Sequence, residues 1–146
     1  MVDLLARTKM SDSKPVATPL PTDHAITLLD GTSLTDATEY RQVIGALQYL
    51  SFTRPDIAFA VNKLAQFMHR PTTDHWSLAK RLLRYLKGTI GHGLLLRRDS
   101  PITLHAYSDA DWAGNLDDRT STSAYVLFLG SNAISWSSRK QKSIAH

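Results

Sequence analysis

Two aspartates, Asp109 and Asp111, have the residue type and spacing that could do chemistry. They lie in the stretch YSDADWAGN, residues 107–115, where an alternating apolar run ends. Residues two apart in a strand face the same side of a sheet, so both carboxylates could reach one cation if the strand continues through Asp111. Hard divalent ions prefer carboxylate oxygens, and two-metal nucleases use several of them. Two carboxylates are a weak signal, and spacing by itself favours a strand that ends in an Asp-rich turn.

The sequence offers few types of side chain that could complete a metal site. The sequence has 12 aspartates but one glutamate, Glu39, and it has no cysteine for a disulfide or a thiolate site. A mechanism that requires a glutamate beside Asp109 must therefore use Glu39 or a residue outside this chain. The six histidines lack the spacing of zinc ligands. We expect His69 and His75, which flank a predicted helix break, at the surface.

A second group of residues could bind phosphate. Lys80, Arg84 and Lys87 recur at steps of four and three residues, which places them on one side of a predicted helix. Such a row could follow a nucleic-acid backbone. Cations near the C-terminal end of a helix also favour its dipole, and spacing alone favours this simpler interpretation. A further basic cluster near the C-terminus consists of Arg139, Lys140 and Lys142.

Composition excludes several classes of protein. The 146 residues are 42% hydrophobic, which is enough for a packed core. The N-terminus, MVDLLARTKMSDSKP, resembles neither a signal nor a transit peptide, and no stretch approaches the roughly 18 apolar residues of a membrane span. We therefore expect an intracellular chain with no membrane partner. The net charge of +4 and the pI of about 9.5 favour an anionic partner, although solubility alone could explain them.

The elements that must position these residues change in period along the chain. Residues 1–35 are predicted to be an extended, linker-like segment after a short N-terminal helix, because Pro15, Pro19 and Pro21 fix the backbone and lack donors. Residues 36–90 are predicted to form three packed helices, since apolar residues recur at steps of three and four. The predicted helix limits are 37–51, 53–68 and 73–88. Asp36 paired with Glu39 is the predicted cap of the first helix, Thr53 that of the second, and Thr72 or Thr73 that of the third. The third helix is predicted to end at Gly88.

From Gly88 onward the period becomes that of strands. Strands are predicted at 93–98, 102–109, 121–129 and 133–138, and turns at 99–101 and 130–132. The sequence therefore predicts an α+β protein, in which a helical unit at 36–90 precedes an antiparallel sheet at 91–146.

Four blocks of this sequence resemble consecutive segments of copia-type retrotransposon Pol polyproteins. They are KPVATPL at 14–20, the run from YRQVIGALQYL to LLRYLKGT at 40–89, YSDADWAGNLDDRTSTSAYVLFLG at 107–130 and SWSSRKQKSIAH at 135–146. In that family this region passes from the end of the reverse transcriptase, with its helical thumb and connecting segment, into RNase H. The resemblance implies a thumb-like unit at 36–90 and an incomplete RNase H-like sheet at 91–146, that is, a truncated fragment.

The resemblance also implies roles for the candidate residues. Asp109 matches the first catalytic, metal-binding aspartate of the RNase H fold, and Asp111 is given no catalytic role. The family's polymerase motif Tyr-x-Asp-Asp does not occur in this sequence. The catalytic glutamate of the family follows the block that ends at His146, and Glu39 falls in the thumb-like unit. Mg²⁺ serves the intact family, whereas this chain is expected to hold an incomplete site at Asp109, no cofactor and no activity of its own.

The partner that the resemblance implies is nucleic acid. The resemblance favours phosphate contact by Lys80, Arg84 and Lys87 over the interpretation of a solvated helix face. The binding it implies is weak and non-specific, to an RNA–DNA hybrid or a duplex. The RNase H sheet of the family packs against later helices, so a face of the sheet is expected to stay bare and could associate. Two alternatives remain: a nuclease or polymerase portion that is active only when an additional chain completes it, and a domesticated module that binds a partner protein.

Overall fold

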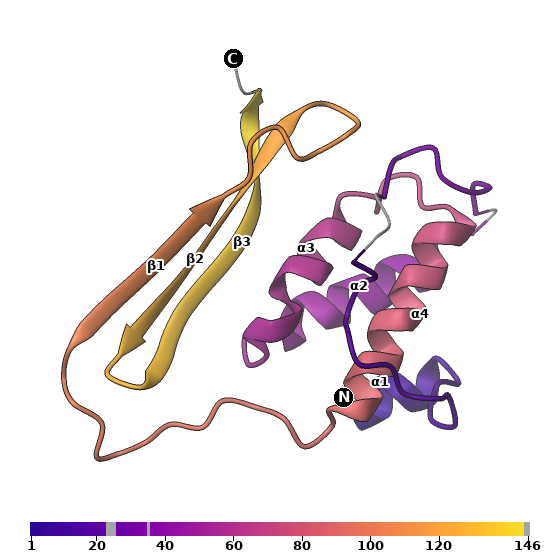
Figure 1. The fold of residues 1–146 in the computed structure, drawn as a ribbon. Coiled ribbons are helices and arrows are strands. Elements are labelled where there is room, and N and C mark those ends of the chain that lie inside the picture. Colours follow the sequence, from indigo (N-terminus) through magenta and orange to yellow (C-terminus); the bar gives the residue numbers. More distant parts are fainter. Residues whose placement is uncertain (23–25, 35, 145–146) are drawn as a thin grey trace. The chain divides into compact units, whose positions relative to one another are not determined.

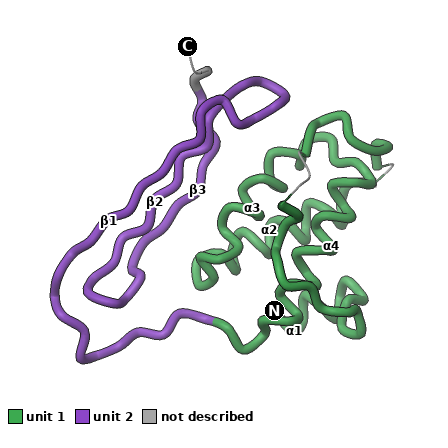
Figure 2. The backbone as a smooth tube through the Cα atoms, in the orientation of Figure 1, with its two compact units in different colours: residues 1–92 green, residues 93–146 purple. Residues whose placement is uncertain are grey.

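The chain folds into two compact units (Figure 2), Met1–His92 and Gly93–His146. A computed structural model describes residues 1–22, 26–34 and 36–144, and residues 23–25, 35 and 145–146 lie outside this description. Helices make up the first unit and an antiparallel sheet the second (Figure 1). This order confirms the α+β class that the change of period at Gly88 predicted.

The helices of unit 1 follow the apolar periodicity closely. They are α1 (Val2–Arg7), α2 (Thr38–Leu50), the 3-10 helix η1 (Pro55–Ile57), α3 (Ala58–Ala65) and α4 (Thr73–Gly88). The predicted second helix is divided, because Pro55 starts a tighter 3-10 turn before the α-helical pattern begins. No helix in the described part of the chain has the length and apolar character that crossing a bilayer requires.

The predicted caps are only partly correct. Thr72 caps α4, as one of the two candidates, and α4 ends at Gly88. The N-cap of α2 is Ala37 without a side-chain cap, so the capping pair of Asp36 with Glu39 is wrong, although Asp36 accepts a hydrogen bond from the backbone N of Thr38 at 2.8 Å. Thr53 does not cap the second helix, because its hydroxyl donates back to the carbonyl of Leu50, 3.1 Å away.

The core of unit 1 lies where the apolar faces of its helices meet. Leu4 and Leu5 of α1 are buried in the same cluster, so the N-terminal helix packs into the helical unit. Residues 32–34 are also attached to it: the N of Thr73 donates to the carbonyl of Thr32 at 2.8 Å. Side chains with no exposed surface in this core are Ile44, Leu47, Ile57, Leu64, Ala79, Leu82, Leu83 and Leu86.

Unit 2 is built around a three-stranded antiparallel sheet in the order β1-β2-β3. The strands are β1 (Leu104–Ala110), β2 (Thr120–Leu129) and β3 (Asn132–Ile144). Gly130 and Ser131 turn the chain between β2 and β3, and Gly130 has a φ of +59°, which the lack of a Cβ permits. These strands confirm three of the four predicted ones.

The predicted strand at 93–98 is wrong. Its apolar run Leu94–Leu96 is exposed, and no ladder pairs it with the sheet. The side-chain amide of Asn132 instead holds the backbone of Arg97, accepting from its N at 2.7 Å and donating to its O at 2.9 Å. An apolar run is not sufficient for a strand, because a strand also needs a neighbour with unpaired backbone groups.

Apolar side chains of the sheet are exposed. All seven residues of β1 are exposed, Leu104 at 66% and Tyr107 at 65%. On β2 and β3, Tyr125 is 44% and Ile134 50% exposed. Sheets that leave apolar side chains uncovered favour association, and association through this sheet stays a prediction.

Candidate functional site

Asp109 lies in β1, opposite Ala124 of β2. The residue is exposed, and its Oδ1 accepts a hydrogen bond from the backbone N of Ala110 at 2.8 Å. A single carboxylate in contact with water binds Mg²⁺ weakly, because a hydrated ion gives up its water only for several well-placed oxygens.

Asp111 ends the pairing of β1 with β2 through both its backbone and its side chain. Its backbone N donates to the carbonyl of Thr122 at 3.1 Å, and the N of Thr122 donates to Oδ1 of Asp111. A Cβ on Gly114 would overlap Oδ2, so glycine at this position lets the loop close over the carboxylate. The Asp111 carboxylate is therefore an acceptor that shapes the loop.

The loop from Asp111 to Thr120 is an ordered turn. Asn115 is 5% exposed, and its backbone pairs with Thr120 through a hydrogen bond of 3.0 Å from N to O. The side chain of Asn115 accepts from the N of Asp117 at 2.9 Å, which is a turn typical of Asn. In the parts of the chain that the structure describes, no three or more His, Cys, Asp or Glu residues come together as metal ligands. The stretch 107–115 thus places Asp109 beside a structural turn.

Asp118 ties this loop to β3. Its Oδ2 lies 2.6 Å from Nζ of Lys140, and its Oδ1 accepts from the hydroxyl of Thr120 at 2.7 Å. The hydrogen bond from Lys140, followed by those from Thr120, lowers the pKa of Asp118 from 3.8 to about 2.

We expect this ion pair to stabilise the loop above pH 4 and to be lost as the pH falls towards 2. The pKa of Asp118 is lower in the folded chain than in the unfolded chain, so protonation removes stability on the acid side. The stabilisation is small, because the carboxylate side chain is 45% exposed. Carboxyl ¹³C NMR should give a midpoint near 2 for Asp118 and one closer to 3.8 in Lys140→Gln. A midpoint near 3.8 in the unaltered chain would contradict the pair.

The N-terminal end of α4 is fixed by a buried capping box. The hydroxyl of Thr72 accepts from the N of His75 at 3.4 Å, and Nδ1 of His75 accepts from the N of Thr72 at 3.1 Å. The His75 ring stacks on Phe67 with a centroid separation of 3.9 Å, and its Nε2 donates to the carbonyl of Thr27 at 2.8 Å. The surface position expected for His75 is wrong: the residue has no exposed surface.

The C-terminal end of α4 is fixed by Arg54, which is only 2% exposed. Its Nε and Nη2 donate to the two carboxylate oxygens of Asp56 at 2.9 and 2.7 Å. Nη1 donates to the carbonyl of Thr89 at 3.0 Å, and Nη2 also donates to the Thr89 hydroxyl. The hydroxyl of Tyr85 donates to Asp56 at 2.8 Å. Hydrogen bonds from Arg54 hold the pKa of Asp56 below its usual value.

Between these two fixed ends, one face of α4 carries four cations, which we call the cationic row: Lys80, Arg81, Arg84 and Lys87. The three predicted phosphate-binding residues lie together in it. Lys80 is exposed, and its Nζ lies 5.5 Å from the ring centre of Trp76. The other three cations contact a segment of the chain that sequence reasoning did not connect with α4.

That segment is residues 13–18, which we call the strap. Arg84 donates from Nε to the carbonyl of Lys14 at 2.6 Å, and Lys87 donates from Nζ to the carbonyl of Ser13 at 2.8 Å. Arg81 donates from Nη2 to the hydroxyl of Thr18 at 2.8 Å. These acceptors are neutral, so the positive charge of the row is not cancelled.

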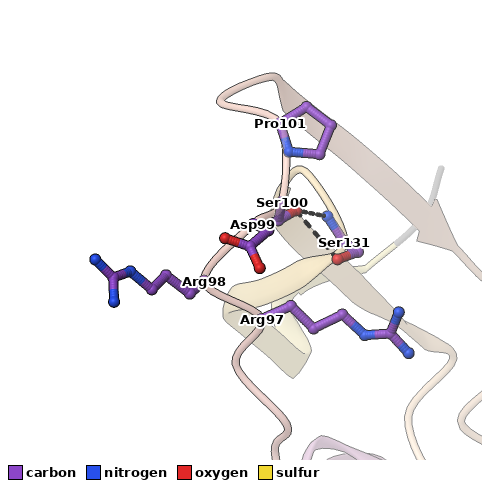
Figure 3. Close-up of a pocket in the computed structure, with 6 residues that line it drawn as sticks. All are labelled: Arg97, Arg98, Asp99, Ser100, Pro101 and Ser131. Atoms are coloured by element: carbon purple, nitrogen blue, oxygen red, sulfur yellow. Dashed lines mark hydrogen bonds between the residues drawn. The ribbon is translucent and has the colours of Figure 1, made fainter.

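A hollow of about 510 Å³ in unit 2 is lined by Arg97, Arg98, Asp99, Ser100, Pro101 and Ser131. Figure 3 shows the Arg97 and Arg98 guanidinium groups pointing in opposite directions, with the Asp99 carboxylate between them. The hydroxyl of Ser100 accepts from the N of Ser131 at 2.7 Å. The two cations do not converge on a common point, so this hollow has the geometry of a turn and not of an anion site.

Comparison with known proteins agrees with the resemblance. The chain is 58% identical over 143 residues to the retrovirus-related Pol polyprotein from transposon RE2 and 56% identical over 144 residues to that from transposon RE1, both of Arabidopsis thaliana. It is 38% identical over 149 residues to that from transposon TNT 1-94 of Nicotiana tabacum. These matches cover 98%, 99% and 97% of the chain but only 10%, 10% and 11% of the relatives.

No family model matches the sequence, and no solved structure matches it significantly. The three relatives nevertheless match nearly the whole chain, across both units. The chain therefore belongs to the retrovirus-related Pol polyproteins of copia-type transposons, as a segment about a tenth of their length.

Proposed function

We propose that this chain is the part of a retrotransposon Pol polyprotein where the thumb and connecting segment of the reverse transcriptase lead into RNase H, and that its helical unit binds nucleic acid without sequence preference. The order of a helical unit and an antiparallel sheet supports the first part. The cationic row of α4 carries the second part.

The row has the length and chemistry for phosphate contact. Lys80 and Lys87 are seven residues apart, or about 10 Å along a helix that rises 1.5 Å per residue. Phosphates of one strand follow each other at about 3.4 Å along a duplex axis, so a row that lies along this axis spans about three phosphate steps. Cations that contact phosphates read no base edges, and the expected binding is therefore independent of sequence and sensitive to salt.

We propose further that the chain alone does not cleave an RNA–DNA hybrid. A two-metal mechanism needs enough ligands to hold both ions. Asp109 offers an exposed carboxylate, whereas the carboxylate of Asp111 is engaged by the backbone N of Thr122. Mg²⁺ is the ion that carboxylate oxygens at this position would suit.

The binding proposal predicts that Lys80→Gln weakens binding of a fluorescent 20-base-pair RNA–DNA hybrid by up to about eightfold at 0.1 M salt. The loss of one phosphate contact lowers the magnitude of the slope of log K against log salt concentration by about 0.9. Between 1 M and 0.1 M salt, this change of slope corresponds to a factor of about eight in affinity. Anisotropy titrations between 50 and 200 mM KCl measure both quantities. Lys80→Arg should bind like the unaltered chain, and Arg7→Gln, which removes an exposed charge from α1, should leave the slope unchanged.

The same samples test the alternatives. With Mg²⁺ present, we expect neither the unaltered chain nor Asp109→Ala to cleave the hybrid. Cleavage that disappears in Asp109→Ala would overturn the proposed inactivity, and cleavage that appears only after a second chain is added would favour a completed nuclease. Equal affinity and equal salt slopes for Lys80→Gln and the unaltered chain would overturn the role of the row.

A further inference from the structure

We propose that the strap is an autoinhibitory contact: residues 13–18 and a nucleic-acid backbone compete for the same cations of α4. This inference rests on the proposed binding of nucleic acid by the cationic row. According to this inference, Arg84 and Lys87 can contact phosphates only after the strap has dissociated from them.

The strap follows α4 in the antiparallel sense (Figure 1), since successive strap residues contact successively earlier residues of the helix. Ser13 meets Lys87, Lys14 meets Arg84, and Thr18 meets Arg81. The three cations lie at steps of three residues along one face of α4. The strap thus covers three of the four members of the row and leaves Lys80 uncovered.

The strap is held mainly by its carbonyl oxygens and by one close apolar contact. Pro15 packs on Gly88, where an added Cβ would lie 3.0 Å from the Cβ of Pro15. Pro15 also lacks an N–H, so at this point the strap presents an acceptor and no donor to a basic helix. The absence of a side chain at Gly88 is what allows the strap to approach α4 so closely.

The contact is suited to exchange with phosphate. Hydrogen bonds in which both partners are charged are stronger than those between a cation and a neutral carbonyl. The strap residues are exposed or half-buried, so releasing them returns carbonyls to water and exposes little apolar surface. Because the strap belongs to the same chain, however, it competes at a high effective concentration. Lys80, which the strap does not contact, would bind phosphate first. The strap would lower the affinity of the other three cations for phosphate.

Gly88→Ala tests this inference because it displaces the strap and keeps every cation. Alanine fits the helical backbone of α4, but its Cβ crowds Pro15. We expect the variant to bind the 20-base-pair hybrid about threefold more tightly, which corresponds to a strap bound in two-thirds of the free molecules. Gly91→Ala is the matched control: it lies three residues further on, with nothing within 4 Å of an added Cβ, and should leave the affinity unchanged.

A spin label gives a second readout that does not depend on Gly88. The chain has no cysteine, so an Ala17→Cys variant takes a nitroxide at one position of the strap. Saturating hybrid should increase the mobility of this label in the electron paramagnetic resonance spectrum. A label whose mobility stays the same at saturation would overturn the inference, even if Gly88→Ala failed to fold.

The two proposals can fail separately. If Lys80→Gln weakens binding with the predicted loss of slope, but Gly88→Ala binds like Gly91→Ala and the label is unaffected, the strap does not compete and the row still binds nucleic acid. If the unaltered chain and Gly88→Ala both fail to bind the hybrid, the proposed function is wrong and the inference falls with it.

Discussion

Replacing Arg54 by alanine is expected to lower the free energy of unfolding of the helical unit by about 3 kcal/mol. The side chain of Arg54 is 3% exposed and donates to both carboxylate oxygens of Asp56 and to the carbonyl and hydroxyl of Thr89. Its removal leaves Asp56 without its cation and the end of α4 without its anchor. The cost is at the lower end of the range for buried pairs, because the Asp56 side chain is 36% exposed and water can partly replace the arginine.

Denaturant unfolding followed by circular dichroism at 222 nm measures this loss, because all helices in the described residues lie in unit 1. Arg54→Lys keeps the charge but not the planar fork, so it should lose an intermediate amount. Arg70→Ala removes an exposed arginine of the same unit and should change the unfolding free energy by less than about 0.5 kcal/mol. A change of similar size for Arg54→Ala would show that the network contributes no stability.

The second large effect is expected for His75→Ala, at about 3 kcal/mol. The substitution opens a cavity beside Phe67, breaks the capping box with Thr72 and leaves the half-buried Thr27 without the donor to its carbonyl. Each loss alone is modest. Together they detach the start of α4 from the segment that contains Thr27.

His75→Gln separates these contributions. Glutamine, like glutamate, forms a capping box at the third helical position after threonine. This variant should therefore keep the cap, lose the ring stack on Phe67 and the hydrogen bond to Thr27, and unfold with an intermediate free energy. His69→Ala, at an exposed position before α4, should remain within about 0.5 kcal/mol of the unaltered chain. If His75→Gln lost as much as His75→Ala, the ring stack and the hydrogen bond to Thr27, and not the cap, would carry the stabilisation.

The strap changes how the cationic row should be read in sequence. Lys80, Arg84 and Lys87 are spaced as a phosphate-binding row, and α4 does present them on one face. The same donors that suit phosphate also suit the carbonyls of an extended proline-containing segment, and two of the three bind such carbonyls here. The spacing of cations on a helix shows which residues share a face but not which acceptor occupies them.

Local signals were sufficient for most of the elements. Apolar residues at three- and four-residue steps located α2, α3 and α4, and Thr72 and Gly88 marked the two ends of α4. Alternation located the three strands of the sheet. Local signals were insufficient at Leu94–Leu96, where an apolar run has the composition of a strand but no partner strand.

The sequence by itself determined the α+β order, the apolar faces and the family. The reason is that periodicity, capping chemistry and the residue order of a motif are properties of neighbouring residues. Only the tertiary structure decided that His75 is buried, that Arg54 reaches Thr89, that Asp111 closes its own loop and that residues 13–18 cover α4. Most of these contacts join residues separated by 35 to 74 positions. The role of a polar side chain depends on the partner that packing brings to it, and that partner is distant from it in the sequence.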